Sequence, residues 1–386
     1  MKFSYTHHMP YTEVGEAGQD WPVANKRFDP RRGAEMYRDY IDNKVFAEEI
    51  GFDWIASNEH HMSPYGLMPN PNLIGAVVAE RTKKSKILQS GVIVPLVNPL
   101  RVAEEYAMLD MISGGRLVAG FMRGIPHEYV AYNVDPSESY GRMTEAVQLI
   151  KKAWSEPEPF GWEGEFYQYR AVSIWPRPLQ QPYPEILMSG SSEGSARLAA
   201  ETGATMGVLR IQEYDAAHHS INIYKAHARK HGWEPKPENI MLAMNCCIAP
   251  TREEAMETLS RGYDYFFGVL GGGIRTAQRL VVQKTRYYSS ASDAARQTKK
   301  FLGHAQLTLE ERMERGLVMC GNPEMAIKQI TRLHDEFGHG LTNLSIKIGN
   351  VPDEKVIQTM ELLRDEVFPA VRHLGIEQPV LAVAAK

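Results

Sequence analysis

The sequence predicts an α/β protein of the (β/α)8 barrel class, in which a closed ring of parallel strands is surrounded by helices. Short apolar runs alternate with longer segments of helical spacing along nearly all of the 386 residues. Eight such strand–helix units fit a chain of this length, because each parallel crossover needs a helix on the outside. A doubly wound open sheet is the structural alternative, but the glycine-rich fingerprint that usually follows its first strand is missing from this sequence.

Each strand is assigned from an apolar run, and each helix from apolar residues that recur every three or four positions. The strands are predicted at 2–6, 53–57, 87–96, 117–121, 186–188, 205–209, 240–248 and 341–348. The helices are predicted at 34–50, 71–82, from Pro99 onward, and at 143–154, 193–201, 213–231, 252–267, 323–337 and 353–374. Gly51 closes the first helix, and Pro99 suits a first helical position. An alternating aromatic stretch at 161–170 predicts a β-hairpin.

We interpret residues 1–386 as one barrel domain with a long insertion near 268–320. In this insertion three consecutive glycines, 271–273, precede a polar segment rich in lysine and arginine, and the alternation of elements is lost. Long loops in a barrel often act as lids. A mobile helical lid at the barrel mouth is therefore expected, and a solvated basic face without a role is the alternative.

The composition argues against nucleic-acid and membrane partners. The net charge is −4, and no block of basic residues suits a phosphate backbone. The amino terminus lacks the apolar stretch of a signal peptide, and no segment is apolar over the length of a bilayer. The 3 cysteines form no CxxC pair, which fits a reducing compartment. A cytoplasmic protein is expected.

The candidate catalytic residues are Glu59, His60 and His61, which follow the second predicted strand. A carboxylate and two imidazoles at the carboxyl end of a buried strand lose hydration, and this loss costs free energy unless the groups are paired. Such groups are kept where they pair with one another or take part in chemistry. In parallel α/β folds, this end of the strands carries the active site. The plainer interpretation is a capped strand end with one structural histidine. A cluster of three titratable groups favours a functional site over that interpretation.

Several ordered motifs resemble one family over nearly the whole chain. They are Glu59-His60-His61 followed by GLMPNP at 66–71, SGVIVP at 90–95 with NPLRVAE at 98–104, LDMISGGRL at 109–117, GNPE at 321–324 and EVFPAVR at 366–372. Together they resemble the bacterial luciferase-like flavin-dependent monooxygenases. The fold of that family is the same (β/α)8 barrel that the alternation of elements predicts.

The resemblance implies a flavin, FMN, bound at the barrel mouth. Arg123 matches the family's phosphate-binding arginine, and Ser90 and Gly91 match a strand bulge that often has a cis peptide bond. Met122 stands where luciferase has a cysteine beside the flavin, which counts against light emission but not against oxygen chemistry. The other implied cofactor-binding residues are Gly190, Ser191, Ser192 and Ser195. They open a predicted helix, and a helix start favours an anion through free N–H groups and its dipole; a simple N-cap is the alternative.

The resemblance further implies a two-component monooxygenase. A separate flavin reductase would supply reduced FMN, which with O2 would oxygenate a hydrophobic small molecule by hydroxylation, epoxidation or Baeyer–Villiger insertion. His60 would act as the acid or base, with Glu59 and His61 orienting or shaping the site. Family members are commonly homodimers or homotetramers.

Three other functions are weighed against that one. A deazaflavin-dependent oxidoreductase would share the fold but transfer hydride. A metallohydrolase using His7, His8, His60 and His61 is disfavoured because adjacent residues on a strand point to opposite faces, and no metal is expected. A non-catalytic flavin-binding protein is disfavoured by the intact Glu59-His60-His61 cluster.

Overall fold

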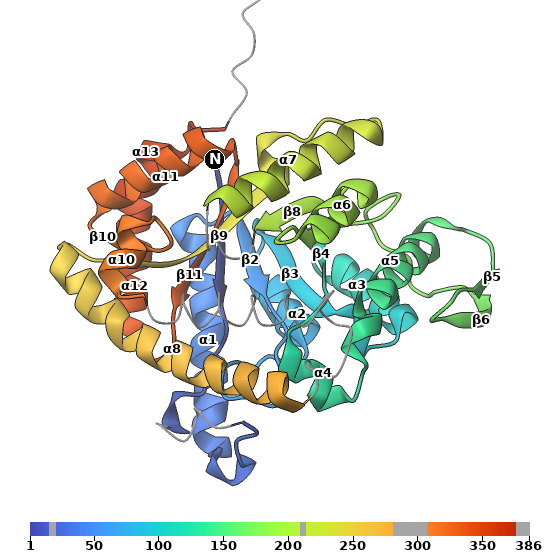
Figure 1. Cartoon of the computed structure of the whole chain (residues 1–386), viewed down its shortest axis with the longest axis horizontal. Coiled ribbons are helices and arrows are strands. Elements are labelled where there is room, and N and C mark those ends of the chain that lie inside the picture. Colours follow the sequence, from blue (N-terminus) through green and yellow to red (C-terminus); the bar gives the residue numbers. More distant parts are fainter. Residues whose placement is uncertain (15–20, 209–213, 281–306, 376–386) are drawn as a thin grey trace, which may run out of the picture.

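The structure, a computed structural model, describes residues 1–14, 21–208, 214–280 and 307–375 (Figure 1). Parallel strands pair in the ring order β1-β2-β3-β4-β7-β8-β9-β11, and the pairing of β11 with β1 closes the ring. Their bounds are β1 (Lys2–His7), β2 (Trp54–Ser57), β3 (Lys86–Ile93), β4 (Leu117–Met122), β7 (Glu185–Ser189), β8 (Thr205–Val208), β9 (Ile240–Ile248) and β11 (Leu341–Lys347). The predicted (β/α)8 barrel is confirmed.

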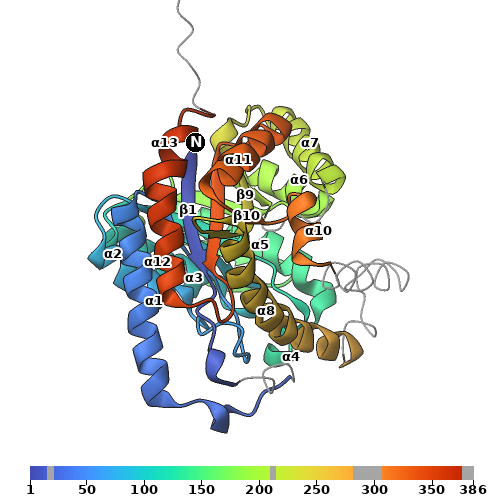
Figure 2. The ribbon, with the colours of Figure 1, turned by 90° about the vertical axis from the view of Figure 1, so that its left-hand side faces the viewer.

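Helices cover the outside of the barrel, and Figure 2 shows α1 and α12 side by side, with β1 visible to the right of α12. The large helices are α1 (Pro30–Ile50), α2 (Pro71–Arg81), α3 (Pro99–Ile112), α5 (Ser139–Ser155), α6 (Glu193–Thr202), α7 (Tyr214–Lys230), α8 (Arg252–Leu280), α11 (Pro323–Phe337) and α12 (Asp353–Leu362). A π-helical turn, Leu363–Val367, links α12 to α13 (Phe368–Val371). Among the described helices, none combines the length and the apolar character needed to cross a bilayer.

Four of these helices begin with an Asn or Asp followed by proline. The N-cap residues are Asp29, Asn70, Asn98 and Asn322, and each side chain accepts a hydrogen bond from a backbone N–H in the first turn. Proline then occupies the first helical position, where its missing N–H costs nothing. This dipeptide therefore fixes the start of α1, α2, α3 and α11 from local sequence alone.

The barrel has separate inner and outer apolar layers because strand side chains alternate between the two faces. The inner layer consists of Trp54, Ala56, Leu88, Val118, Met122, Leu187, Met241 and Leu341. The outer layer is much larger and packs the opposite face of each strand against the helices. Paired residues such as Leu88 and Val118 share a face, so the strand register places Met122 at the inner, carboxyl-terminal end of β4.

The third strand carries a bulge between Gln89 and Val92, and its Ser90–Gly91 peptide bond is cis, as predicted. At the bulge, β3 and β4 approach so closely that only glycine fits. A Cβ on Gly120 would lie 1.8 Å from the Gln89 carbonyl oxygen, and one on Gly91 would lie 2.3 Å from the Gly120 oxygen. Two glycines on adjacent strands thus shape the wall beside the candidate site.

The structure corrects the predicted insertion at 268–320 at both ends. Helix α8 does not stop at 267 but continues through the three glycines to Leu280. At the other end, α10 (Leu309–Glu314) and strand β10 (Met319–Gly321) are regular elements, and β10 pairs with β9. The glycines fit a helix here because a Cβ on Gly273 would lie 3.3 Å from the His127 ring. The central part of the predicted lid, 281–306, lies outside the described residues.

Two smaller elements flank the barrel. The predicted hairpin is present as β5 (Phe160–Glu163) and β6 (Gln168–Val172), which pair antiparallel and project from the right-hand side of Figure 1. A short helix that the sequence analysis did not predict, α4 (Pro126–Tyr132), follows β4. It contacts α8, which runs diagonally across the lower front of Figure 1.

Buried Lys44 is expected to make the protein more stable as the pH rises from 7 to 9. Burial lowers the pKa of Lys44 to about 7, so over this range the unfolded chain binds a proton that the folded chain does not. The free energy of unfolding then rises with pH, by up to about 1.4 kcal/mol per pH unit. Thermal unfolding of the parent and of Lys44→Met at several pH values tests this expectation. The melting temperature of the parent relative to that of Lys44→Met should rise with pH. Lys83→Met, at an exposed site, is the control. Plots of melting temperature against pH that run parallel for all three proteins would contradict the expectation.

Candidate active site

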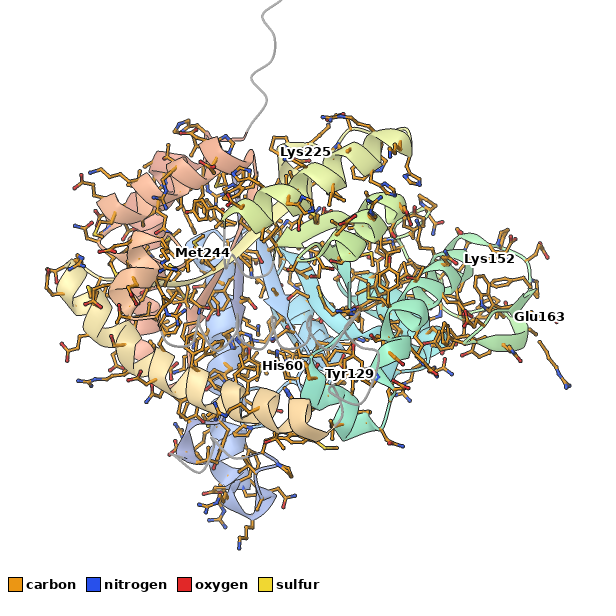
Figure 3. The ribbon with its side chains drawn as sticks, viewed as in Figure 1. His60, Tyr129, Lys152, Glu163, Lys225 and Met244 are labelled. Atoms are coloured by element: carbon orange, nitrogen blue, oxygen red, sulfur yellow. The ribbon has the colours of Figure 1, made fainter. Side chains whose placement is uncertain are left out.

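The candidate site lies at the barrel mouth, the end of the barrel to which the carboxyl ends of the strands point. Figure 3 labels His60 and Tyr129 there, beside α4, whereas Lys225 on α7 lies at the other end of the view. Glu59, His60 and His61 follow the end of β2. Of these three, Glu59 and His61 are buried, and His60 keeps partial exposure. This combination suits a site in which one imidazole exchanges protons and the other groups hold positions.

His60 is held by a carboxylate that the sequence analysis did not identify. Its Nδ1 lies 2.8 Å from Oε1 of Glu128, a buried residue of α4. The other oxygen, Oε2, accepts the Ile125 backbone N–H at 2.8 Å, which fixes the carboxylate at the start of the helix. A carboxylate partner requires a proton on Nδ1, which leaves Nε2 as the nitrogen that can accept or give a proton.

Glu59 and His61 form a separate chain of hydrogen bonds. Oε1 of Glu59 lies 2.6 Å from Nε2 of His61, and Oε2 accepts the Ile93 backbone N–H at 3.0 Å. The His61 Nδ1 lies 3.0 Å from the Tyr132 hydroxyl. Burial raises the pKa of Tyr132, with Glu59 and Glu128 adding to the effect, so the hydroxyl stays protonated and donates to His61. Both ring nitrogens of His61 are thus occupied by hydrogen-bond partners.

Aromatic rings enclose His60 on its other sides. The ring of Tyr65 lies 4.6 Å from that of His60, and the ring of His8 lies 5.5 Å from it in a stacked arrangement. Phe266 of α8 contacts both Tyr65 and His8. Gly66 permits the close packing, since a Cβ there would lie 3.3 Å from the His60 Cβ. The rings limit the access of water to His60, and in a drier site electrostatic interactions are stronger.

The predicted cofactor residues meet on neighbouring strands. Strand β4 pairs with β7 so that Phe121 lies opposite Met188, which sets Met122 and Arg123 beside the turn that follows β7. That turn leads into α6, whose N-cap is Ser192. These residues come from the bulge inside β3 and from the chain at and after the ends of β4 and β7, which are three adjacent strands; they are Ser90, Gly91, Met122, Arg123, Gly190, Ser191, Ser192 and Ser195.

Tyr140 contacts the start of α6. The Tyr140 hydroxyl donates to the Gly194 carbonyl at 3.3 Å. Burial raises the pKa of Tyr140, Glu201 adds to the rise, and the positive charge of Arg123 acts in the opposite direction. We call Arg123, Gly190, Ser191, Ser192 and Ser195 the candidate phosphate site.

The start of α6 has features of both a cap and an anion site. Ser192 and Ser195 form a reciprocal capping box, in which each backbone N–H donates to the other side chain. The cap leaves the N–H groups of Glu193 and Gly194 in the first turn, where a helix offers no acceptor of its own. Ser191 and Ser192 are exposed, so their hydroxyls remain accessible. An anion is further favoured by the helix dipole, whereas Glu193, paired with Arg197, opposes it.

His127 is a second mouth residue that the sequence analysis missed. It is buried between Trp21 and Gly273, and within the described part of the chain neither ring nitrogen has a hydrogen-bond partner. Burial lowers its pKa to about 4 against the opposing effect of Glu128, so the ring is neutral at pH 7. The signal for α4 was present in Ile125-Pro126 followed by Glu128, because proline and glutamate suit the first and third helical positions.

The histidines weighed as ligands of a metallohydrolase lie in different surroundings. His7 is fully buried, its Nε2 lies 3.2 Å from the Tyr40 carbonyl oxygen, and burial holds its pKa well below the usual value. His7 and His8 therefore point apart, as the sequence analysis argued. None of His7, His8, His60 and His61 belongs to a three-ligand metal group among the described residues.

A cavity of about 310 Å³ lies at the opposite, amino-terminal end of the barrel. Its charged lining residues include Lys86 with Glu185 and Lys2 with Glu238, which form ion pairs. In (β/α)8 barrels the residues at this end serve stability, and chemistry takes place at the carboxyl ends of the strands. Because its charges are already paired and the histidines lie at the other end, we do not assign the reaction to this cavity.

Comparison with known sequences identifies the family. The model of the luciferase-like monooxygenases matches residues 22–340. The chain is 35% identical over 181 residues to an uncharacterised Sinorhizobium fredii protein, 46% of this chain and only 53% of that one. It is 27% identical over 256 residues to the oxygenase component of the flavin-dependent trigonelline monooxygenase of Acinetobacter baylyi, 65% of this chain and 70% of that one.

Solved structures share the fold. The oxygenating constituent of 3,6-diketocamphane monooxygenase from Pseudomonas putida, in complex with FMN, superposes with a TM-score of 0.71 at 21% identity, covering 96% of this chain and 98% of the other. An F420-dependent secondary alcohol dehydrogenase gives 0.67 at 18% identity, covering 87% and 95%. The family match spans most of the chain. The chain belongs to the luciferase-like monooxygenase family.

Proposed function

We propose that the protein is the oxygenase of a two-component FMN-dependent monooxygenase. Reduced FMN from a separate flavin reductase and O2 would oxygenate a small organic substrate. The observation that carries the proposal is the arrangement at the mouth, where the Glu128-held His60 shares one end of the barrel with Arg123 and the start of α6. The trigonelline relative is named as the oxygenase component of such a system, which supports the assignment.

The residues at the mouth fit a flavin phosphate. Arg123 supplies a permanent positive charge, and Ser191 and Ser192 supply accessible hydroxyls at a helix start. The orphaned Asn58 Oδ1 and Ser345 Oγ, buried without a partner among the described residues, offer hydrogen bonds to the polar edge of a ring system. A bound reduced flavin would supply the activation of O2, which no amino-acid side chain provides.

The chain itself would manage protons and exclude water. Glu128 keeps the proton on Nδ1 of His60, so that Nε2 can accept a proton from the reacting group and return it. Tyr65, His8 and Phe266 limit the entry of water around that nitrogen. Glu59 ties His61 to the backbone of β3, which holds the loop after β2 in place.

The second candidate function is hydride transfer with the deazaflavin F420, favoured by the structural likeness to the F420-dependent alcohol dehydrogenase. Anaerobic titration with reduced FMN and with reduced F420, followed by mixing with oxygenated buffer, distinguishes the two. Tight binding of reduced FMN with oxygen uptake that depends on substrate supports the monooxygenase. Tight binding of F420 but not of FMN, with no oxygen uptake, would contradict the monooxygenase proposal and support hydride transfer. Trigonelline and camphane-type ketones, named in the relatives, are the first substrates to screen.

Replacing Arg123 by alanine is expected to weaken FMN binding. A bidentate guanidinium–phosphate contact contributes about 2 kcal/mol, which corresponds to a dissociation constant raised roughly thirtyfold. Fluorescence titration measures the constant, with Arg123→Lys retaining part of the affinity and the exposed Arg170→Ala as the control. An unaltered dissociation constant in Arg123→Ala would show that the flavin phosphate does not bind at Arg123.

Partners and location also belong to this proposal. A homodimer or homotetramer and a hydrophobic substrate are proposed from the family alone, and light scattering tests the first. The free, buried Cys246, Cys247 and Cys320 support a reducing compartment such as the cytoplasm.

A further inference from the structure

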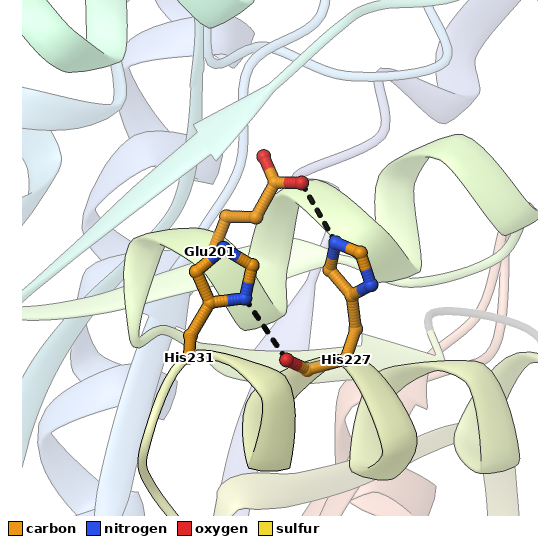
Figure 4. A group of neighbouring side chains, drawn as sticks. All are labelled: Glu201, His227 and His231. Carbon is orange, nitrogen blue, oxygen red and sulfur yellow. Dashed lines mark hydrogen bonds and ion pairs between the residues drawn. The ribbon is translucent and has the colours of Figure 1, made fainter.

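The outer helices α6 and α7 bring together three side chains whose types and positions match a metal site. Glu201 lies in the last turn of α6, His227 lies in the last turn of α7, and His231 directly follows the end of α7 (Figure 4). One ligand atom from each residue lies within 4.8 Å of the other two. Histidines four residues apart on a helix share one face, which is the spacing of many zinc-binding helices. We propose that Glu201, His227 and His231 bind a divalent transition-metal ion, with zinc as the best fit.

The hydrogen bonds leave the histidines in a form that can bind a metal. The His231 Nδ1 lies 2.9 Å from the His227 carbonyl oxygen, so Nδ1 carries the proton and Nε2 has a free lone pair. A bond from the second ring nitrogen to a backbone carbonyl is the usual support of a metal-bound histidine. The His227 Nε2 lies 2.8 Å from a Glu201 carboxylate oxygen, and a metal would take the place of the proton between them.

The backbone under the three residues is fixed by buried contacts. The Trp233 Nε1 donates to the Ala200 carbonyl at 3.0 Å, one residue before Glu201. The Tyr224 hydroxyl donates to the Ala204 carbonyl at 2.7 Å, and its ring packs on that of Trp233. These bonds hold the end of α6 against the end of α7. Only the three side chains, of which Glu201 and His231 are exposed and His227 is half-buried, must therefore move to reach the separation of ~3.3 Å between ligand atoms in a tetrahedral zinc site.

Charge and exposure also suit a metal ion. Glu201 and His231 are exposed, so an ion can enter from solvent. The neighbouring cations are engaged with other groups, Arg229 with Glu234 and Lys151 with the Thr202 carbonyl. One carboxylate and two neutral imidazoles leave a fourth position for water. Because the ligands lie on outer helices and not at the strand ends, the site would clamp α6 to α7 and take no part in oxygenation.

Zinc competition with a chromophoric chelator, on the untagged full chain after EDTA treatment, tests the proposal. The parent should bind one zinc ion, and His227→Gln and His231→Gln should each weaken binding by about tenfold or more. His218→Gln is the matched control, because His218 lies on the same helix and pairs with Glu336 at 2.6 Å, but no third ligand completes a metal group there among the described residues. Its zinc affinity should equal that of the parent.

Two further measurements make the result specific. Co²⁺ should give the intense visible absorbance of a tetrahedral site in the parent and in His218→Gln but not in His231→Gln. Zinc should raise the melting temperature of the parent and not that of His231→Gln, because only the parent binds the ion in the folded state. Equal zinc affinity in all four proteins would overturn the proposal and direct attention to the mouth histidines. A parent that binds no zinc at micromolar concentration would overturn it as well.

Discussion

Replacing His60 by alanine is expected to lower substrate oxygenation by on the order of a hundredfold or more, while FMN binding stays close to that of the parent. The reason is geometric. Glu128 holds the His60 Nδ1 at 2.8 Å, which leaves Nε2 as the exchangeable position, and the candidate phosphate site lies on other strands. Oxygen uptake that depends on substrate measures the loss, and fluorescence titration measures flavin binding.

Two controls separate proton transfer from packing. Added imidazole should restore part of the turnover of His60→Ala, because the ring can re-enter the space that the substitution leaves. Glu128→Gln, which keeps the shape but removes the charge, should cause a smaller loss of about tenfold, because His60 stays in place with a weaker partner. Turnover of His60→Ala equal to that of the parent would remove His60 from the proton chemistry.

Replacing Gly120 by alanine is expected to reduce the free energy of unfolding by about 3 kcal/mol or more. The added Cβ would lie 1.8 Å from the Gln89 carbonyl oxygen and 2.9 Å from its carbonyl carbon. Both are backbone atoms of the β3 bulge, so no side chain can move aside, and β3 and β4 must separate. Since Met122 and Arg123 end β4, flavin binding should weaken as well.

Urea unfolding followed by circular dichroism gives the stability change of Gly120→Ala. Gly161→Ala is a suitable control, because a Cβ on Gly161 of the hairpin would meet its nearest neighbours at an ordinary 3.6 Å. The control should change stability by less than about 0.5 kcal/mol. A Gly120→Ala protein as stable as the control would mean that the two strands can separate at the bulge without cost.

Much of the fold follows from local sequence. The repeated Asn-Pro or Asp-Pro starts of four helices, the alternating apolar strands and Gly51 in a left-handed conformation at the end of α1 all depend on neighbours in the chain. The end of α8 was misjudged for a physical reason. Three glycines lower helix propensity, but the close packing of Gly273 on His127 favours the helix in the folded protein. Local propensity is a weak guide where tertiary packing opposes it.

The histidines of the candidate site could be predicted from the sequence, but the carboxylate that pairs with each of them could not. The sequence analysis named His60 and left its partner open, with Glu59 suggested; the structure gives it Glu128, 68 residues away along the chain. Glu59 instead binds His61 and the backbone of β3. Both carboxylates lie near histidines, and only the position of α4 decides which one pairs with which ring.

By itself the sequence determined the barrel, the end of the barrel that carries the histidines, and the family, because periodicity and short motifs are properties of neighbouring residues. Tertiary structure alone decided the Glu128–His60 pair, the burial of His127, the contact of β3 with β4 at Gly120 and the meeting of Glu201 with His227 and His231. Each of these joins segments that the chain brings together only when the ring of strands closes, and distance in space is not encoded in spacing along the sequence.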